Sequence, residues 1–281
     1  MNRPREVAVV GAGTMGAGIA SVFADAGAAV RLNARREASL DAARERAGDA
    51  VRMTTDLDEA LAGADLVVET IVEEVEPKRA VLARAEEVAA PDAILATNTS
   101  SLSLAEVGRD LKHPERFAGL HFLNPPELVE VVEIVGADRT ARETLATLEG
   151  WVEELGKAPV VVSLDVPGFV INRLQYALLR EAYALVDAGV CTFEDVDRAL
   201  THGLGARWAA IGPFETMDLA GLDVHAAVAS NLWPELATTT KPSASIAAAR
   251  ERGSIRADFD PEALEERRDR VLRALRQLRE A

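Results

Sequence analysis

The sequence predicts an α/β fold, in which a doubly wound sheet is followed by an all-helical C-terminal domain. Two observations lead to this prediction. Short β-branched runs alternate with helical patterns in the first part of the chain, and such alternation is typical of a parallel sheet covered by helices on both faces. From Phe169 onward the patterns are almost all helical. We therefore expect two domains, residues 1–165 and residues 166–281.

The strand-like runs of the first domain are short and apolar, as in buried parallel strands. They lie at Val7–Val10, Ala29–Leu32, Leu66–Glu69, Ile94–Thr97, Phe117–Phe122, Val129–Val135 and Pro159–Val162. Helical patterns between them lie at Met15–Ala26, Glu37–Asp49, Pro77–Ala89 and Thr140–Leu155. Gly27 ends the first of these helices, because glycine is favoured just beyond a helix C-terminus.

The second domain reads as a series of helices. Phe169–Ala188 keeps apolar residues at helical spacing, and Thr192 is a favourable N-cap for a helix at Phe193–Thr201. The pair Asp260–Pro261 opens a last helix, whose apolar positions are Leu264, Val271, Leu272, Leu275 and Leu278. Ser230–Asp258 is rich in small residues and poorly patterned, so we leave it unassigned.

Charge and composition limit the classes of function. With 31 Lys and Arg against 46 Asp and Glu, the net charge of −15 argues against nucleic acid or an anionic membrane as a partner. No run approaches the roughly 20 apolar residues of a membrane span, and no signal segment precedes the first strand. Cys191 is the only cysteine, so we expect no intrachain disulfide and a cytoplasmic location. The four histidines lack the spacing of ligands, so we expect no metal site.

A glycine-rich motif follows the first strand at once. Gly11, Gly13 and Gly16 have the G-x-G-x-x-G spacing, and Thr14 and Met15 lie between the last two. A strand precedes the motif and a helix follows it. In that context the first glycine permits a tight turn, the second lets a pyrophosphate approach the backbone, and the third lets the helix pack on the strand. The motif predicts a Rossmann-type dinucleotide site at the helix N-terminus.

The end of the second strand indicates which dinucleotide binds. An acidic residue there would bond the ribose hydroxyls of NAD, but the position carries Ala34, followed by Arg35 and Arg36. A small residue followed by guanidinium groups admits and pairs with a 2′-phosphate. The pattern favours NADP over NAD. The alternative is that both arginines are ordinary surface charges and that NAD binds.

His121 is the leading candidate for a general base. It lies at the end of an apolar run, and Pro125 and Pro126 turn the chain after it. Glu133 follows on the next apolar run, where a carboxylate can orient an imidazole. The alternatives are a satisfied core histidine and a glutamate on the surface of a strand.

Several motifs resemble, in order, those of the 3-hydroxyacyl-CoA dehydrogenase family. They are Gly11–Gly16, Val68–Glu73, Thr97–Leu102, Gly119–Pro125 and Pro167–Arg173. Three segments are closest to the branch that contains L-gulonate 3-dehydrogenase and lambda-crystallin. They are Asn172–Ala177, Gly203–Trp208 and Ile211–Pro213. The resemblance covers most of the chain. It implies a Rossmann domain, a helical domain, and a homodimer formed through the helical domain.

The resemblance also implies the roles of individual residues. His121 matches the family's catalytic histidine and Glu133 its carboxylate partner. The polar residues that contact the substrate oxygen are matched by Ser100 and Asn172. Positions that line the cofactor site are matched by Glu73, Lys78 and Asn98. The implied activity interconverts a 3-hydroxy and a 3-keto acyl group with NAD(P), and neutral His121 takes the hydroxyl proton as hydride leaves.

The substrate is expected to differ from the CoA thioesters of the family's best-known members. Those members usually carry a long helical insertion after the second strand, whereas here about twenty residues, enough for one helix, separate Ala34 from Thr55. We expect a small free 3-hydroxy acid, or a 3-hydroxyacyl group on CoA or a carrier protein. Arg207, placed in a Gly-rich turn beside Trp208, would clamp a substrate carboxylate or else bond backbone carbonyls.

Two other classes are compatible with parts of the pattern. Serine, histidine and glutamate also serve hydrolases, but the chain has no G-x-S-x-G elbow, and a hydrolase leaves the glycine motif unexplained. A non-catalytic crystallin-like or dinucleotide-sensing protein is the second class, because a fold does not determine function. The combination of His121, Glu133, Ser100 and Asn172 favours the enzyme.

Overall fold

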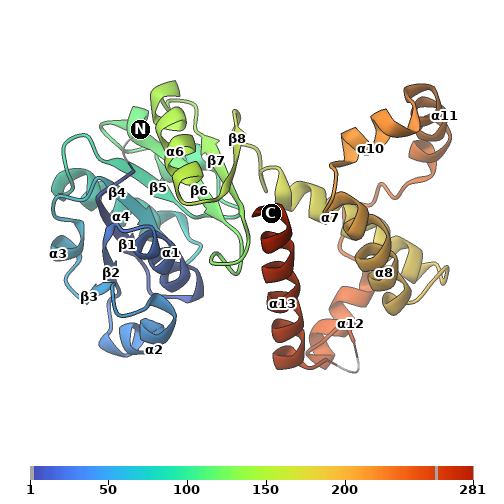
Figure 1. The fold of residues 1–281 in the computed structure, drawn as a ribbon, viewed down its shortest axis with the longest axis horizontal. Coiled ribbons are helices and arrows are strands. Elements are labelled where there is room, and N and C mark those ends of the chain that lie inside the picture. Colours follow the sequence, from blue (N-terminus) through green and yellow to red (C-terminus); the bar gives the residue numbers. More distant parts are fainter. Residues whose placement is uncertain (1–2, 257–258, 281) are drawn as a thin grey trace. The chain divides into compact units, whose positions relative to one another are not determined.

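The chain forms two compact units, Met1–Arg173 and Leu174–Ala281, in a computed structural model that describes residues 3–256 and 259–280 (Figure 1). The division falls after residue 165 because Phe169 is buried against the first unit, and the backbone N–H groups of Val170 and Ile171 bond Glu133. The sequence-based expectations for residues 1–2 and 257–258 lie outside the described residues.

An eight-stranded sheet forms the centre of the first unit in the described part of the chain. The strand order is β3-β2-β1-β4-β5-β6-β7-β8. The strands β2 and β4 lie on opposite sides of β1, so the direction of strand addition reverses there. Such a switch point is where open α/β sheets bind ligands. The strands are β1 (Glu6–Val10), β2 (Ala29–Asn33), β3 (Arg52–Thr54), β4 (Leu66–Glu69), β5 (Ile94–Thr97), β6 (Phe117–Phe122), β7 (Val131–Gly136) and β8 (Ala158–Val162).

The prediction of a wholly parallel sheet is wrong at one edge. β7 runs antiparallel to β6, and β8 pairs parallel to β7. A parallel neighbour needs a crossover of a dozen or more residues, usually with a helix. The link between Phe122 and Val131 is shorter than that and contains Pro125 and Pro126, so the chain turns back beside β6. The short strand β3, which the sequence patterns did not indicate, lies at the opposite edge.

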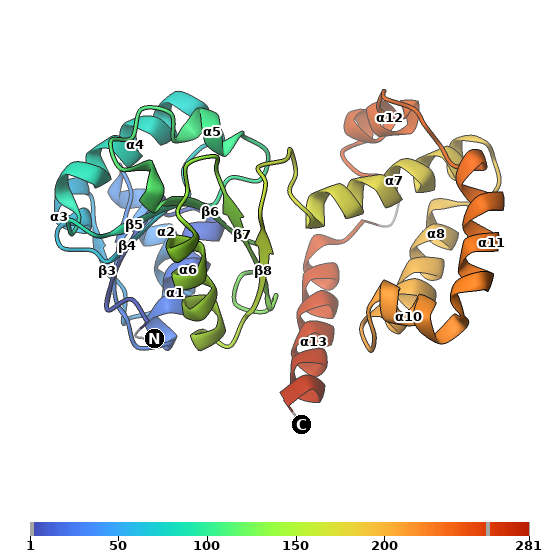
Figure 2. The ribbon, with the colours of Figure 1, turned by 90° about the horizontal axis from the view of Figure 1, so that it is seen from above.

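Helices cover both faces of the sheet, as the alternation of patterns predicts. One face packs against α1 (Thr14–Asp25), α2 (Glu37–Ala47) and α6 (Arg142–Glu154). The other packs against α3 (Leu57–Leu61), α4 (Val75–Val88) and α5 (Leu104–Val107). Figure 2 shows α4 and α5 on one side of the strands and α1 and α6 on the other. The carboxyl ends of β1, β4, β5 and β6 therefore meet at one edge between these layers.

Alternation along β6 and β7 places two polar side chains on the same face. Leu120 packs in the apolar layer beneath α1, α2 and α6, whereas Phe117 and Val135 pack in the layer beneath α3, α4 and α5. Because side chains alternate between faces, His121 shares the face of Phe117, and Glu133 shares the face of Val135. Both residues are buried, at 4% and 0% exposure.

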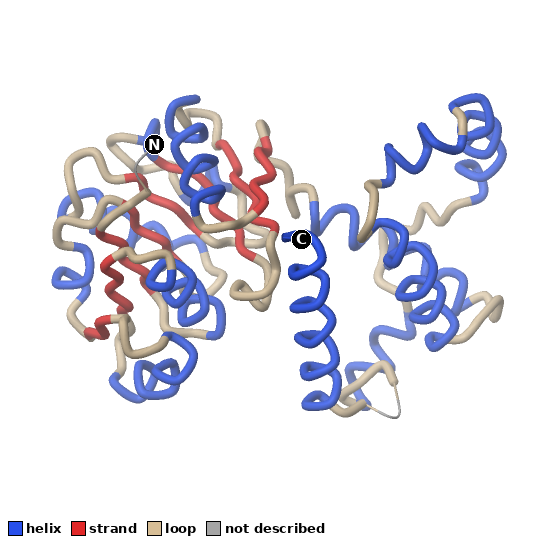
Figure 3. The backbone as a smooth tube through the Cα atoms, in the orientation of Figure 1, coloured by secondary structure: helices blue, strands red, loops and turns tan. Residues whose placement is uncertain are grey.

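The described residues of the second unit form helices joined by loops (Figure 3). Thr192 caps α8 (Phe193–Ala199) through a capping box with Asp195, as expected for an N-cap. Ser230–Asp258 includes helical residues that its small side chains did not reveal, and Gly203–Trp208 is helical where a turn was predicted. The helical segments are α7 (Ile171–Asp187), α8 (Phe193–Ala199), the π-helix Leu200–Leu204, α9 (Gly205–Trp208), α10 (Pro213–Ala220), α11 (Leu222–Leu232), the 3-10 helix Trp233–Glu235, α12 (Ala244–Arg252) and α13 (Pro261–Glu280).

The second unit buries little of its own surface. Among its described residues, only Thr216, Ala229 and Ala249 are buried. Large apolar side chains are exposed on it, such as Phe214 at 83% and Leu219 at 78%. No helix in the described ranges combines the length and the apolar character that crossing a membrane requires.

Candidate active site

The glycine motif forms the turn between β1 and α1. Gly11 has a φ of +116°, which side chains rarely allow, and its N–H bonds the carbonyl oxygen of Asn33 at 2.8 Å. A Cβ on Gly16 would lie 1.7 Å from the carbonyl oxygen of Gly11, so α1 can pack here only with glycine. A Cβ on Gly13 would have no heavy atom within 4 Å, which means that open space lies over this residue.

The N-terminus of α1 has unpaired backbone donors. Gly13 is its N-cap and has no side chain that could accept from them. The N–H groups of Thr14 and Met15, in the first turn, have no intrahelical acceptor. Open space over Gly13 and unpaired donors beside it are the features that a pyrophosphate needs. The loop therefore fits the cofactor that the motif predicts.

Ala34, Arg35 and Arg36 follow the carboxyl end of β2. Ala34 is buried at 8% exposure, whereas Arg35 and Arg36 are exposed. Neither guanidinium group has a hydrogen-bond or ion-pair partner within residues 3–256 and 259–280. Two cationic groups without internal partners are thus available to an anionic ligand at the end of β2.

His121 and Glu133 form a buried hydrogen-bonded pair. They are directly opposite each other in the register of β6 and β7, and Nδ1 of His121 lies 2.8 Å from Oε2 of Glu133. The other carboxylate oxygen, Oε1, accepts from the backbone N–H groups of Val170 at 2.8 Å and Ile171 at 2.9 Å. Both oxygens of Glu133 therefore have partners.

The environment of Glu133 determines the tautomer of His121. Burial raises the pKa of Glu133, but hydrogen bonds from His121, Ile171 and Val170 outweigh it and hold this pKa below its usual range. An ionised Glu133 can only accept, so it receives the proton on Nδ1 of His121. In the neutral imidazole, Nε2 then carries a lone pair, which is the form that a general base needs.

Ser100 lies on the other side of the imidazole. Its Oγ is 3.0 Å from Nε2 of His121, so the hydroxyl donates to the lone pair of this nitrogen. Asn172 lies beside it, and its Nδ2 is 3.4 Å from the carbonyl oxygen of Ser100. The structure thus brings together the four residues that the sequence analysis assigned to catalysis.

Phe169 is a site residue that the sequence analysis missed. Its ring packs edge-on against the ring of His121, with centroids 5.5 Å apart, and it is 1% exposed. Its φ of +49° is unusual for a residue other than glycine. The position next to Pro167 and Gly168 was the available signal, since both residues mark a turn and not the interior of a helix.

The three residues predicted to line the cofactor site all follow β4 or β5. Asn98 follows β5, and its Oδ1 accepts from the backbone N–H of Phe122 at 2.8 Å. Glu73 is partly exposed, and it bonds Ser100 and its two sequence neighbours. Lys78 is almost fully buried, and its Nζ pairs with Glu69 and Glu73. Lys78 can thus reach a ligand only through its carboxylate partners.

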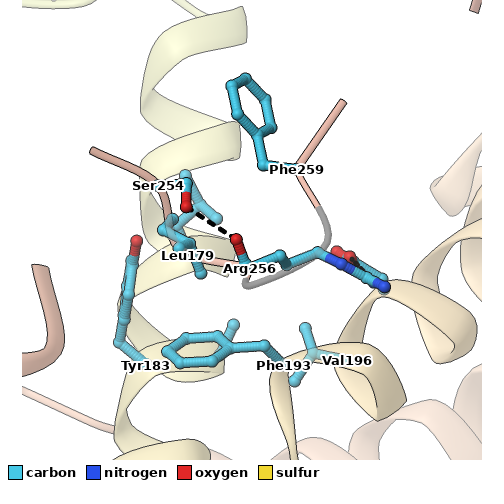
Figure 4. Close-up of a pocket in the computed structure, with 10 residues that line it drawn as sticks. Leu179, Tyr183, Phe193, Val196, Ser254, Arg256 and Phe259 are labelled. Carbon is cyan, nitrogen blue, oxygen red and sulfur yellow. Dashed lines mark hydrogen bonds and ion pairs between the residues drawn. The ribbon is translucent and has the colours of Figure 1, made fainter. Parts of the chain in front are cut away.

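Arg207 belongs to the second unit and lies on α9. It is exposed, and its side chain has no hydrogen-bond or ion-pair partner among the described residues. The same unit has an apolar pocket of about 280 Å³ that is shown in Figure 4. Rings of Tyr183 and Phe193 line it, and Arg256 at its rim pairs with Asp197 at 3.2 Å. Its lining suits an apolar group and not proton transfer.

A dinucleotide loop and an imidazole–carboxylate pair at the same edge of one sheet define a nicotinamide-dependent dehydrogenase. Comparison with known protein families identifies the family of dehydrogenases to which the chain belongs. Residues 6–51 and 44–166 match the model of the 3-hydroxyacyl-CoA dehydrogenase NAD binding domain, and residues 168–251 match the model of its C-terminal domain. The chain belongs to the 3-hydroxyacyl-CoA dehydrogenase family.

Individual relatives agree with this membership. The chain is 37% identical over 250 residues to 5-formyl-3-hydroxy-2-methylpyridine 4-carboxylate 5-dehydrogenase of Mesorhizobium japonicum, covering 83% of this chain and 81% of the relative. It is 36% identical over 245 residues to the mitochondrial hydroxyacyl-coenzyme A dehydrogenase of Sus scrofa, covering 78% and 77%. A crystal structure of the first kind of enzyme, described as an NAD+-dependent dismutase, superposes with a TM-score of 0.93 at 33% identity over 99% of both chains.

The family, the cofactor domain and the relatives together define the reaction class. The protein is an NAD-dependent oxidoreductase that interconverts hydroxyl and keto groups. The assignment to the gulonate dehydrogenase and crystallin branch stays a prediction.

Proposed function

We propose that this dehydrogenase acts on a small free 3-hydroxy acid, which it oxidises to the 3-keto acid or forms in the reverse direction. The observation that carries the proposal is the line of hydrogen bonds from Ser100 through His121 to Glu133. It directs the lone pair of a neutral imidazole at a hydroxyl group, which is what the oxidation of an alcohol needs. A CoA-linked or carrier-linked 3-hydroxyacyl group is the alternative substrate.

Proton transfer would take place at Nε2 of His121. The substrate hydroxyl would give its proton to this nitrogen, and the ionised Glu133 would stabilise the imidazolium that forms. Ser100 and Asn172 would hold the substrate oxygen and support the charge that develops on it. A bound dinucleotide would accept the hydride from the substrate carbon that bears the hydroxyl group. In the reductive direction the imidazolium of His121 is the acid.

Three groups of residues would hold that dinucleotide. The loop Gly11–Gly16 and the first N–H groups of α1 would hold the pyrophosphate. Glu73 and Asn98 would line the nicotinamide end of the site, and Lys78 would contribute through its ion pair with Glu73. Arg35 and Arg36 would pair with a 2′-phosphate, so we propose that NADP is preferred over NAD.

The proposal of a free acid has two supports. The segment between β2 and β3 contains only α2 among described elements, so the long helical insertion that is usual in CoA-dependent members is lacking. The Mesorhizobium relative, whose name gives a pyridine carboxylate as its substrate, matches most of this chain. We further propose that Arg207 binds the carboxylate of the acid, because its guanidinium group has no partner within the described residues.

We also propose a homodimer formed through the helical unit. This unit leaves large apolar side chains exposed and buries few residues, as expected of a surface that a second copy covers. Sedimentation of the purified protein tests the proposal, and a monomer at micromolar concentration would contradict it. A cytoplasmic location stays a prediction from the lone Cys191.

A cofactor-coupled absorbance screen tests the proposed reaction. Free 3-hydroxy acids, their CoA thioesters and carrier-bound forms are offered with NAD and with NADP, and the appearance of reduced cofactor is followed. We expect the largest kcat/KM with a free acid and NADP. Turnover confined to CoA thioesters would contradict the free-acid proposal, and no turnover of any 3-hydroxy compound would contradict the reaction itself.

A further inference from the structure

The loop that carries Ser100 is held by a carboxylate from another part of the sheet. Glu73 follows β4, and its Oε1 accepts four hydrogen bonds from this loop. The donors are the hydroxyl of Thr99 at 2.6 Å, the N–H of Ser100 at 2.9 Å, and the N–H and hydroxyl of Ser101 at 3.1 and 3.0 Å. A single oxygen thus sets the backbone on both sides of the Ser100 side chain.

The other carboxylate oxygen of Glu73 forms an ion pair with the buried Lys78. Oε2 lies 3.3 Å from Nζ of Lys78, which is 1% exposed. This ammonium also lies 2.9 and 3.0 Å from the two carboxylate oxygens of Glu69, which is 0% exposed. Glu69 in turn accepts from the hydroxyl of Thr97 at 2.7 Å. Buried charges of opposite sign with several hydrogen bonds form a fixed base for Glu73.

The charge of Glu73 matches this arrangement. Burial raises its pKa, but hydrogen bonds from Thr99, Ser100 and Ser101 and the charge of Lys78 outweigh it and lower the pKa. The carboxylate is therefore ionised at neutral pH and accepts at both oxygens. An amide in its place has one acceptor and one donor, so it would set an NH2 group against donors on one of its two sides.

We propose that Glu73 is a positioning residue for Ser100, fixing its hydroxyl at hydrogen-bond distance from Nε2 of His121. The inference rests on the proposed function, in which this hydroxyl holds the substrate oxygen. It gives Glu73 a second role beside lining the cofactor site. A group that acts through Ser100 loses its effect when Ser100 is removed, whereas a group that acts on the cofactor does not.

Nitrogen NMR of histidine-labelled protein tests the contact without any turnover. The chain has four histidines, so the His121 resonances are identified by their loss in His121→Gln. We expect Ser100→Ala and Glu73→Gln to shift the Nε2 resonance of His121 in the same direction. Glu76→Gln is the matched control, since Glu76 is exposed and pairs with Arg79. An Nε2 resonance that Glu73→Gln leaves in place would overturn the proposal.

A double-mutant cycle tests the consequence for catalysis. Glu73→Gln should lower kcat about 100-fold in the wild-type background, as expected for a misplaced reacting group. In the Ser100→Ala background it should lower kcat at saturating cofactor about 2-fold or less, and any change in the Kd of the cofactor should be the same in both backgrounds. Equal losses of kcat in both backgrounds would overturn the proposal. Inactivity of the wild type would contradict the proposed function, and the NMR result would then decide the role of Glu73.

Discussion

His121 and Glu133 are directly opposed residues of two antiparallel strands, and 2.8 Å separates Nδ1 of the imidazole from Oε2 of the carboxylate. The sheet register itself sets this distance. A shift of either strand by one residue would turn one of the two side chains to the other face. The backbone hydrogen bonds of the sheet therefore set the pair, and the N–H groups of Val170 and Ile171 hold the other oxygen of Glu133.

Replacing His121 with alanine should abolish proton transfer and leave cofactor binding intact. General-base catalysis contributes about 10²–10⁴-fold, so we expect kcat to fall by that factor. The cofactor Kd, measured by fluorescence, should not change. His113→Ala is the matched control, since His113 is exposed and pairs with Glu115. Near-normal turnover of His121→Ala would remove this residue as the base.

Glu133 should make the stability of the protein depend on acid pH. Its pKa is lower in the folded state than the usual value of about 4.3, so its stabilising effect is complete above that pH. The effect is lost as the pH falls through the lower, folded-state pKa. Chemical unfolding of wild type and Glu133→Gln between pH 7 and pH 3 tests this. We expect the free energy of unfolding to fall more steeply with acidification in the wild type, and parallel curves would contradict the assignment.

Removing both arginines after β2 should affect NADP and spare NAD. Loss of two charge-assisted contacts in Arg35→Ala/Arg36→Ala should lower kcat/KM for NADP about 10- to 100-fold. The value for NAD should stay within about 2-fold. Arg44→Ala is the control, since Arg44 is an exposed arginine of α2, the helix after these two residues, and pairs with Asp41. A wild-type enzyme that prefers NAD clearly would refute the NADP proposal.

Arg207→Met should weaken the binding of a free acid. We expect a KM about 10-fold higher or more, with a much smaller change in kcat, because the carboxylate clamp acts in the ground state and the transition state alike. Arg198→Met serves as control, since Arg198 is exposed and pairs with Asp195. An unchanged KM would eliminate the clamp.

Lys157 should stabilise the turn between β6 and β7. It is buried, and its Nζ donates to the carbonyl oxygens of Pro126 at 2.6 Å and Val129 at 2.9 Å. Lys157→Met leaves these buried acceptors without this donor, so we expect the free energy of unfolding to fall by about 2–4 kcal/mol. Lys112→Met, at an exposed position, should change it by less than about 0.5 kcal/mol. Equal stability of both variants would contradict this role.

The sequence predicts this fold well where one pattern dominates. The β-branched runs at β1, β4 and β5, and the glycines after β1, leave few alternatives, and these elements are confirmed. The antiparallel course of β7 was not predicted because an apolar run looks the same in either direction. Alanine-rich α12 was not predicted either, since small side chains give no apolar stripe.

Some residues of the site could be predicted from the sequence, and others could be found only in the folded structure. The position of His121 at a strand end made it a candidate with Glu133, and the resemblance to family motifs added Ser100; the structure places the three in one hydrogen-bonded line. The edge-on contact of the Phe169 ring with His121 and the buried pair of Glu69 and Lys78 arise only in the folded chain. The turn residues Pro167 and Gly168 mark the position of Phe169, but nothing local indicates that its ring packs on an imidazole.

The two oxygens of Glu133 have different tasks, because one bonds His121 and the other bonds the N–H groups of Val170 and Ile171. A substitution of Glu133 would therefore affect both the orientation of His121 and the backbone conformation of the segment after the sheet. In a relative that binds ligands without catalysis, loss of Glu133 would still remove the acceptor that holds residues 167–173. We therefore expect Glu133 to outlast His121 in any relative that has lost its activity.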